Sequence, residues 1–564
     1  MRTPPLSFLG LPLLAVLLSG AATAPPGDDV VFEGGRVVDG TGAPAFVADV
    51  ALHAGRIEVV GPLSESRKSR ARRRIDARGL VVAPGFIDLL GQSEYNVLVD
   101  GRAVSKVTQG ITTEVTGEGS SIAPLNARLV ADGEDVWRRY GVRPDWTTLS
   151  GYFSRFATAP PTINLATFVG LGGLRDLVMG KENRPPTPGE MEAMAREVDR
   201  AMSEGALGVS VSLQYVPDIF FTTEELVALS RVAARRGGVL FVHQRSESDR
   251  VLESLEEVFR VAREASIPAD VWHLKTGNAR NHGKMKEVLA RLEAARAEGL
   301  DVAANQYPWE ASSNGLDACL PPWVREGGRE KLLARLRDPA TREKAKAGMA
   351  REGEGWENQW LGASAGAGVL VAAVLDPALE RYQGKRITEI AVAEGKDPRD
   401  ALIDLVLADR ANTNGIHFTM SEADVRLALA HRLVAFCTDS GAVAPDGPFA
   451  AQRSHPRAWG SATRILGKYV REEKLLPLEE AVRKMTSFPA ARARLADRGI
   501  LRPGLAADVT VFDPATVRAV STYEDPRRVS EGVLYVAVSG RLVVDGGKVT
   551  AERPGRILRG PAAR

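Results

Sequence analysis

Residues 81–92 read Val-Val-Ala-Pro-Gly-Phe-Ile-Asp-Leu-Leu-Gly-Gln, an apolar run whose first part, 81–87, predicts a buried strand. Similar apolar runs recur along the middle of the chain, at 113–116, 163–170, 207–211, 239–243, 269–273, 302–306 and 433–437. Amphipathic stretches lie between several of them, at 188–204, 224–236 and 284–299. Strands that alternate with helices predict a parallel sheet with right-handed crossovers, and about eight strands suffice for a (β/α)8 barrel.

The two ends of the chain carry a different pattern. Short β-rich runs alternate with glycine-containing turns at 30–60 and again at 497–550, which is typical of strands and hairpins. We therefore expect an α/β protein with two domains. A TIM-like barrel is expected over residues 85–490, and a small β-sandwich domain is expected from both termini, residues 25–84 and 491–555.

Two segments stand apart from these domains. The stretch at about 318–430 is longer than one crossover helix needs, so we expect a helical insertion near the barrel mouth. Residues 1–24 have the pattern of a secretory signal peptide, with Arg2, an apolar region at 6–18 and Ala22-Thr23-Ala24 as the cleavage site. The sequence therefore predicts an exported, periplasmic protein.

Charge and cysteine content exclude several classes of protein. The formal net charge of +2 gives no electrostatic case for binding nucleic acid or an acidic membrane surface. The chain has 2 cysteines, Cys319 and Cys437, which is too few for a disulfide scaffold, and we expect both to be small buried side chains. A small-molecule substrate is the expected partner.

Three polar residues stand where apolar runs end. His243 follows Val239–Val242, His273 follows Val271-Trp272, and Asp439 follows the run at 433–437. Chemistry in such barrels sits at the carboxyl ends of the strands. Two imidazoles on neighbouring strand ends can share a zinc ion, although each alone can be structural. Asp439 can bind metal and shuttle a proton, or it can cap the next helix.

Two further residues are ambiguous from position alone. Glu118 lies between glycines after the strand at 113–116, where it can ligate a metal or be an exposed turn acid. Tyr307 follows the strand at 302–306, where it can bind substrate through its hydroxyl or be an ordinary aromatic of the barrel rim.

Several longer stretches together resemble the D-aminoacylase, or N-acyl-D-amino-acid deacylase, branch of the amidohydrolase superfamily. The resemblance covers nearly the whole mature chain. Its most specific stretches are GITTEVTGEG at 110–119, HQRSE at 243–247, HLKTGNARNHGK at 273–284, ANQYPWEASSNGLDACLPPW at 304–323 and SHPRAWGSATRILGKYVRE at 454–472.

The resemblance implies one zinc ion. That family holds a tight zinc with a cysteine and two histidines, whose positions match Glu118, His243 and His273 here. A carboxylate can replace a thiolate as a zinc ligand. The family's second, weaker metal uses a His-x-His pair on the first strand, and Leu90 and Gln92 stand at those positions. Leucine cannot ligate and glutamine is a poor zinc ligand, so a dinuclear site is not expected.

The resemblance also implies a reaction. Zinc polarises the amide carbonyl of the substrate, and Asp439 takes a proton from water and later gives it to the leaving amine. The family holds the substrate carboxylate with residues that match Lys275, Tyr307 and Ser313, and Arg245 is expected in the same pocket.

The leading hypothesis is a mononuclear metal-dependent amidohydrolase that deacylates N-acyl-D-amino acids or related carboxylate-bearing amides. One alternative is a cyclic-amide hydrolase on the same barrel. The other is a non-catalytic small-molecule binding protein, which the loss of the His-x-His pair favours and which His243, His273 and Asp439 argue against.

Overall fold

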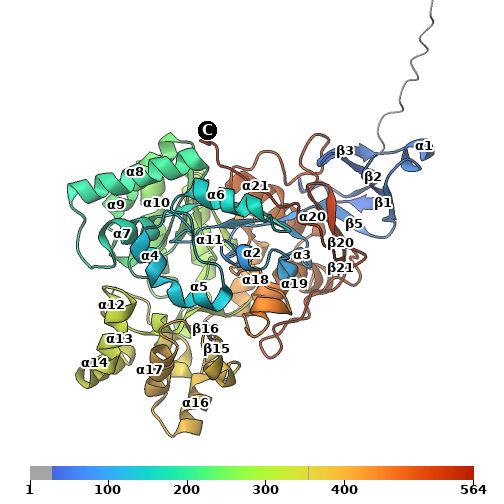
Figure 1. Cartoon of the computed structure of the whole chain (residues 1–564). Helices are drawn as coiled ribbons and strands as arrows, with labels where there is room; N and C mark the ends of the chain where they lie inside the picture. The colour runs from blue at the N-terminus through green and yellow to red at the C-terminus, as the bar shows by residue number, and fades with distance from the viewer. Residues whose placement is uncertain (1–27, 354, 564) are drawn as a thin grey trace, which may run out of the picture.

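The structure is a computed structural model, which describes residues 28–353 and 355–563 (Figure 1). The expected signal peptide, residues 1–24, lies outside the described residues. Figure 1 shows a central barrel, a β-domain beside it in which blue and red strands meet, and a yellow-to-gold insertion on another side. Among the described residues, no helix is both long and apolar enough to cross a membrane.

The barrel consists of two parallel sheets that together supply eight strand positions. The first sheet contains β6 (Phe86–Asp88), β7 (Ile111–Thr116) and β8 (Asn164–Thr167). The second contains, in order, β9 (Val169–Gly170), β10 (Gly208–Ser212), β11 (Val239–His243), β12 (Ala269–Val271), β13 (Val302–Gln306) and β17 (Val434–Phe436). Only Phe168 separates β8 from β9, and a parallel bridge between Gly91 and Ser440 joins the other two edges. The eightfold alternation predicted from sequence is thus present in the described chain.

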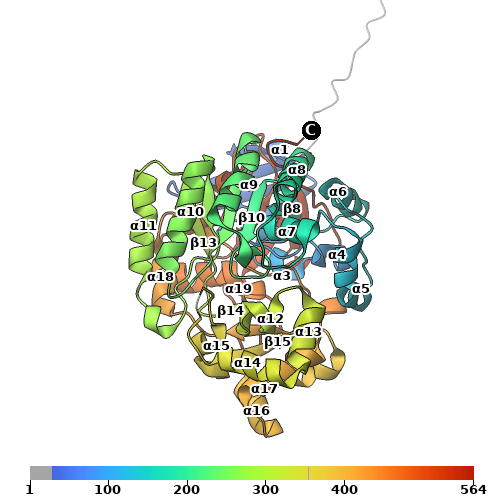
Figure 2. The ribbon, with the colours of Figure 1, turned by 90° about the vertical axis from the view of Figure 1, so that its left-hand side faces the viewer.

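Helices cover the outside of these strands. Those after β9 to β12 are α8 (Pro188–Glu204), α9 (Thr223–Arg235), α10 (Val251–Ala265) and α11 (Met285–Ala297), and Figure 2 shows α8 to α11 as neighbours on one flank. Both α8 and α9 begin with a capping box, in which a threonine and a glutamate three residues later satisfy each other's backbone N–H groups. Each helix buries an apolar face against the barrel, because a helix must cover the side chains that the strands turn outward.

The opening stretch, 81–92, divides between two sheets. Its first strand, β5 (Val81–Pro84), pairs with β18 (Val509–Phe512) of the β-domain, and its second, β6, begins the barrel. Gly85 lies at the change of direction, where a Cβ atom would overlap the side chain of Thr112. The single strand expected at 81–87 is therefore two short strands, since the chain changes domain at Gly85.

The β-domain is built from both termini, as expected. Its sheet has nine strands: β1 (Val30–Val37), β2 (Phe46–His53), β3 (Arg56–Gly61), β4 (Arg73–Asp76), β5, β18, β19 (Val533–Val538), β20 (Arg541–Asp545) and β21 (Lys548–Val549). Hydrogen bonds run continuously from β21 through β18 and β5 to β1 and β3. The sheet also curls on itself, because Ile57 in β3 exchanges backbone hydrogen bonds with Gly504 and Leu505, just before β18. Its apolar side chains form a cluster of their own.

The insertion after β13 has its own sheet and core. Its antiparallel strands are β14 (Ser312–Gly315), β16 (Asn414–His417) and β15 (Val369–Ala373), and its helices are α12 (Pro322–Arg325), α13 (Arg329–Arg337), α14 (Pro339–Met349), α15 (Gln359–Gly362), α16 (Ile387–Glu394) and α17 (Pro398–Ala408). It is thus mixed rather than purely helical. The helix that follows, α18 (Glu422–Ala430), packs against α11 and β13 and belongs to the barrel. Cys319 in the insertion and Cys437 in the barrel are free and buried, as predicted.

Candidate active site

Three side chains from three strand ends meet in the barrel mouth. Oε1 of Glu118 lies 3.0 Å from Nδ1 of His243 and 3.1 Å from Nε2 of His273. The two imidazole rings stand nearly perpendicular, with centroids 4.5 Å apart. One ligand atom from each residue lies within 4.8 Å of the others, so the three atoms surround a common point.

Local backbone structure brings these residues together. His243 is the last residue of β11, and His273 follows β12 by two residues with φ of 33°, a conformation that costs energy for a non-glycine residue. Its backbone N–H donates to Oδ1 of Asn305 over 2.7 Å, which holds that conformation. Glu118 precedes Gly119, whose φ is +63° and whose Cβ position would lie 2.5 Å from Oγ of Ser212, so the loop after β7 requires glycine there.

The outer nitrogens of both imidazoles also have partners. Nε2 of His243 lies 2.7 Å from Oε1 of Gln214, and Nδ1 of His273 lies 2.9 Å from Oε1 of Glu247. Both partners can accept a hydrogen bond, so Nδ1 of His243 and Nε2 of His273 are the nitrogens whose lone pairs a metal ion would use; without an ion these nitrogens bond to Oε1 of Glu118. This outer arrangement is how metal-binding histidines are oriented in proteins.

The charges of the cluster agree with this arrangement. Burial acts to raise the pKa of Glu118, but the hydrogen bonds from His243 and His273 outweigh it and hold that pKa well below the ordinary value. Burial and the charge of Lys275 act to lower the pKa of His273, yet Glu247 and Glu118 raise it to about 9. An anionic carboxylate beside two imidazoles can bind a metal cation. Such a cation would take the place of the protons that the imidazoles now share with Glu118.

The donor set fits one zinc ion. One carboxylate oxygen and two imidazole nitrogens match the three protein ligands of catalytic zinc sites, which keep a fourth position open. Leu90 and Gln92, which follow β6, add no imidazole to this donor set. Leu90 is fully buried and carries no ligand atom, and Nε2 of Gln92 donates to Oε2 of Glu118 over 2.6 Å. That hydrogen bond occupies the carboxylate oxygen that faces away from the histidines.

Asp439 lies beside this cluster in an ion pair. Its φ is 51°, and its backbone N–H donates to the carbonyl oxygen of Leu90 over 2.8 Å. Oδ2 of Asp439 lies 2.8 Å from Nη1 of Arg457. Burial raises the pKa of Asp439, although Arg457 and His273 oppose the effect. A buried carboxylate with a raised pKa next to a metal-type cluster suits proton transfer.

Lys275 supplies a second buried cation. Its Nζ donates to both carboxylate oxygens of Glu247, over 2.9 and 2.7 Å. The ring of Tyr307 packs against both cations, with its centroid 5.8 Å from Nζ of Lys275 and 4.7 Å from Cζ of Arg457. Tyr307 itself is fully buried and its hydroxyl contacts the sulfur of Met420, so this residue supports the cations from behind.

The three-residue cluster, Asp439, Arg457 and Lys275 line a cavity of about 300 Å³, which we call the catalytic cavity. Tyr307, expected from sequence to bind substrate, is not among its lining residues, because its ring is buried beneath the two cations. The barrel contributes Gln92, Glu118, Tyr215, His243, Glu247, His273, Lys275, Asp439 and Arg457, and the insertion contributes Ser312, Ser313, Asn314, Gly315 and Gln359. Of the residues predicted from sequence, six line this cavity: Glu118, His243, His273, Asp439, Lys275 and Ser313. The mouth of the barrel and one side of the insertion therefore form a single site.

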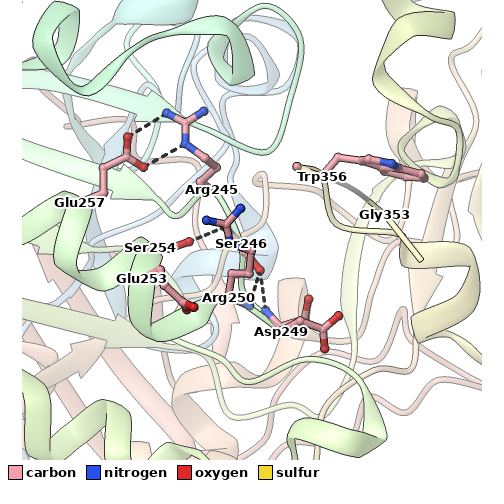
Figure 3. Close-up of a pocket in the computed structure, with 11 residues that line it drawn as sticks. Arg245, Ser246, Asp249, Arg250, Glu253, Ser254, Glu257, Gly353 and Trp356 are labelled. Atoms are coloured by element: carbon pink, nitrogen blue, oxygen red, sulfur yellow. Dashed lines mark hydrogen bonds and ion pairs between the residues drawn. The ribbon is translucent and has the colours of Figure 1, made fainter. Parts of the chain in front are cut away.

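The structure does not bring Arg245 into the catalytic cavity. Its guanidinium donates to Glu257 and to the carbonyl oxygens of Ile219 and Phe221. Figure 3 shows Arg245 in a neighbouring cavity, paired with Glu257 and on the side away from Trp356. The expected substrate-binding role of Arg245 is thus not supported, because in the strand-end sequence at 243–247 this side chain turns outward and fastens the loop at 219–221.

The most informative residue missed as a site residue is Arg457. It is 4% exposed, and its Nε makes no hydrogen bond within the described chain. His455 holds the loop in place, because its Nε2 contacts the carbonyl oxygen of Ala311 over 3.0 Å and its Nδ1 accepts the backbone N–H of Arg457 over 2.9 Å. The stretch His455-Pro456-Arg457 is visible in the sequence, but only the fold places its arginine beside Asp439.

Comparison with known proteins places this site among hydrolases. A model of the amidohydrolase family matches residues 73–544. The chain is 33% identical over 539 residues to a D-aminoacylase of Alcaligenes xylosoxydans xylosoxydans, covering 95% of this chain and 98% of that protein. It is 35% identical over 536 residues to an N-acyl-D-glutamate deacylase of the same organism, covering 95% and 97%. A solved N-acyl-D-glutamate deacylase from Bordetella bronchiseptica, complexed with zinc and a phosphonate mimic of the tetrahedral intermediate, superposes with a TM-score of 0.78 at 32% identity over 94% of this chain and 100% of that chain.

Proposed function

Because this chain belongs to the amidohydrolase family and is a hydrolase of carbon–nitrogen bonds other than peptide bonds, we propose that it removes the acyl group from N-acyl-D-amino acids. One observation carries the proposal: the three-residue cluster of Glu118, His243 and His273 lies in one cavity with Asp439 and two buried cations. Linear amides with a free carboxylate match that combination of groups.

Glu118, His243 and His273 are the residues that would hold a single zinc ion. When bound, such an ion supplies Lewis acidity toward the amide carbonyl and the attacking water. Gln214 and Glu247 fix the two imidazoles in the required tautomers through their outer nitrogens. The single-ion proposal is supported by Leu90 and Gln92, which leave no second pair of imidazoles on the first barrel strand.

Asp439 carries the proton in this proposal. Arg457 engages Oδ2 of Asp439, which leaves Oδ1 to accept a proton from the attacking water and to return it to the departing amine nitrogen. The raised pKa of Asp439 makes it a stronger base toward the attacking water. Its protonated form can still give the proton to the departing amine nitrogen, because that nitrogen is more basic than a carboxylate. Its backbone is fixed by Leu90, so the carboxylate does not need to reorganise.

The two cations orient the substrate. Arg457 and Lys275 both line the catalytic cavity, and Nη2 of Arg457 donates to the carbonyl oxygen of Ser313 over 3.3 Å. A substrate α-carboxylate placed between them gains charge-assisted hydrogen bonds. This placement also puts the amine nitrogen of the substrate next to Asp439, because Arg457 would bind both the substrate carboxylate and the Asp439 carboxylate.

The test compares N-acetyl-D-amino acids with their L-enantiomers on protein of measured metal content. We expect about one zinc per chain and release of the free D-amino acid, with little release of the L-amino acid. Protein that binds zinc but hydrolyses none of the D-substrates would contradict the proposed function. Loss of zinc on His243→Ala, with unchanged circular dichroism, connects the metal to the cluster.

We also propose that the protein is exported. The support is the arrangement of Arg2, the apolar region at 6–18 and Ala22-Thr23-Ala24. Fractionation of cells that express the full chain tests this, with a mature N-terminus near residue 25 expected in the exported fraction. Retention of Met1 in a cytosolic product would contradict export.

A further inference from the structure

A second cavity of about 500 Å³ adjoins the catalytic cavity and shares Glu118 and Tyr215 with it. Its walls also include Gly119, Ser212 and Asp218. The boundary between the two cavities is the ring of Tyr215, whose hydroxyl accepts a hydrogen bond from Nδ2 of Asn314 over 3.0 Å and whose ring lies 5.0 Å from that of His243. The second cavity therefore begins at the metal-type cluster itself.

If the protein is the deacylase proposed above, the second cavity lies on the acyl side of the reacting bond. Asp439, Lys275 and Arg457 line only the catalytic cavity, so the amine nitrogen and the α-carboxylate belong there. The carbonyl carbon lies at the cluster, between the two cavities. Any substituent on the acyl group then continues past Glu118 into the second cavity, because the amine side occupies the other direction.

Two buried polar groups lie in the wall of this space, and one of them has an unpartnered hydroxyl. Ser212 is 4% exposed, and its Oγ has no hydrogen-bond partner in the described part of the chain. Asp218 is 4% exposed, and its Oδ1 accepts the backbone N–H of Ser212 over 2.8 Å. Burial raises the pKa of Asp218 to about 8, which favours the uncharged carboxylic acid at neutral pH. An unpaired buried hydroxyl costs free energy that a polar ligand recovers.

The charged residues in the wall are already paired. Lys181 lies 3.4 Å from Asp176, Arg329 lies 3.5 Å from Asp135, and Asp132 lies 3.1 Å from Arg128. None of these ions needs a counter-charge from a ligand. The chemistry of the cavity is therefore that of uncharged hydrogen-bonding groups.

We propose that the second cavity is an acyl subsite for N-acyl chains that are uncharged and end in a hydrogen-bonding group such as a carboxamide. This inference rests on the proposed deacylase function and names the acyl class that the same site takes. Ser212 and Asp218 contact the end of the acyl chain, and Tyr215 separates it from the amino-acid part.

Three acyl groups of nearly the same shape test the subsite on one D-amino acid, chosen as the one whose N-acetyl derivative is hydrolysed fastest. They are succinamoyl, which ends in an amide, 4-methylpentanoyl, which ends in two methyl groups, and succinyl, which ends in a carboxylate. We expect kcat/KM for succinamoyl to exceed both others by about tenfold or more, because the apolar chain leaves buried polar groups unpaired and the charged chain finds no counter-ion.

The Ser212→Ala variant should lower kcat/KM about tenfold for succinamoyl and less than twofold for N-acetyl and 4-methylpentanoyl. Ser230→Ala is the matched control, since Ser230 in α9 is also buried with an unpartnered Oγ but lines neither cavity. Equal or faster hydrolysis of 4-methylpentanoyl by the unaltered enzyme would overturn the subsite while the deacylase function stands. Failure to hydrolyse even the N-acetyl substrate would overturn both.

Discussion

Gln92 and Glu118 are joined by a hydrogen bond of 2.6 Å, in which the amide of Gln92 donates to Oε2 while Oε1 remains toward His243 and His273. Gln92 thus fixes the orientation of the carboxylate that the two imidazoles share. A carboxylate that is held at one oxygen offers the other as a single-oxygen ligand. This hydrogen bond connects the segment after β6, the first barrel strand, to the cluster of Glu118, His243 and His273.

Replacing Gln92 with methionine should weaken zinc binding about 10- to 100-fold, because ligands lose affinity when the groups that orient them are removed. Competition titration against a chromophoric chelator measures the change. Gln359→Met is the control, since Gln359 lines the same cavity from the insertion. Unchanged zinc affinity in Gln92→Met would show that the hydrogen bond does not position Glu118.

Substitutions of Glu118 should separate ligand chemistry from side-chain size. Glu118→Gln keeps the shape but removes the anionic oxygen, so we expect less than half a zinc per chain after dialysis. Glu118→Cys restores an anionic ligand and should retain about one zinc. Elemental analysis of the folded proteins decides the matter, and full zinc occupancy in Glu118→Gln would contradict a ligand role for this residue.

Asp439→Asn should lower kcat about 10²- to 10⁴-fold with zinc content unchanged, because the amide cannot accept and return the proton. Steady-state kinetics together with metal analysis provide the measurement. Asp446→Asn serves as the control, since that side chain is 71% exposed and pairs with Arg102. Near-normal turnover in Asp439→Asn would rule out this residue as the proton carrier.

Asp218 should make stability fall as pH rises. Burial raises its pKa to about 8 in the folded protein from 3.8, so between these values the folded state holds a proton that the unfolded chain has released. The stabilising effect is fully present below about pH 4 and is lost by about pH 8, with a slope of at most about 1.4 kcal/mol per pH unit. Asp218→Asn should flatten the free energy of unfolding between pH 5 and 8, measured with denaturant. An identical pH slope in both proteins would contradict the shifted pKa.

Lys106 should contribute strongly to the free energy of unfolding, because it joins β6, β7 and the segment after β17. It is fully buried, and its Nζ lies 3.0 Å from Oδ2 of Asp88, 2.5 Å from Oε1 of Glu114 and 2.7 Å from Oγ1 of Thr438. Lys106→Met leaves two buried carboxylates without a cation and should cost about 3–5 kcal/mol of unfolding free energy. Lys331→Met, at a side chain that is 59% exposed, is the control. Equal denaturation midpoints for the two variants would show that the buried ion pairs contribute little.

The barrel elements with regular patterns were predictable from the sequence alone. The strands at 239–243 and 302–306 and the helix at 188–204 have the predicted bounds, because side-chain periodicity is a property of neighbouring residues. His243 and His273 could be singled out for the same reason, since a polar residue at the end of an apolar run is visible locally. The resemblance to known deacylases added Glu118 to that pair.

Only the tertiary structure decided which distant residues meet. The pairing of Gln92 with Glu118, the approach of Arg457 to Asp439 and the position of the insertion beside the cavity all depend on how the loops pack at the barrel mouth. The tertiary structure also turns Arg245 away from the catalytic cavity, toward Glu257. It divides the first apolar run at Gly85, where the chain passes from one sheet to the other. Sequence periodicity specifies which face of an element is buried. The contacts across the barrel mouth join residues from separate loops, such as Glu118 and His273, which lie 155 positions apart in the sequence. Their distances are set by the packing of the whole barrel.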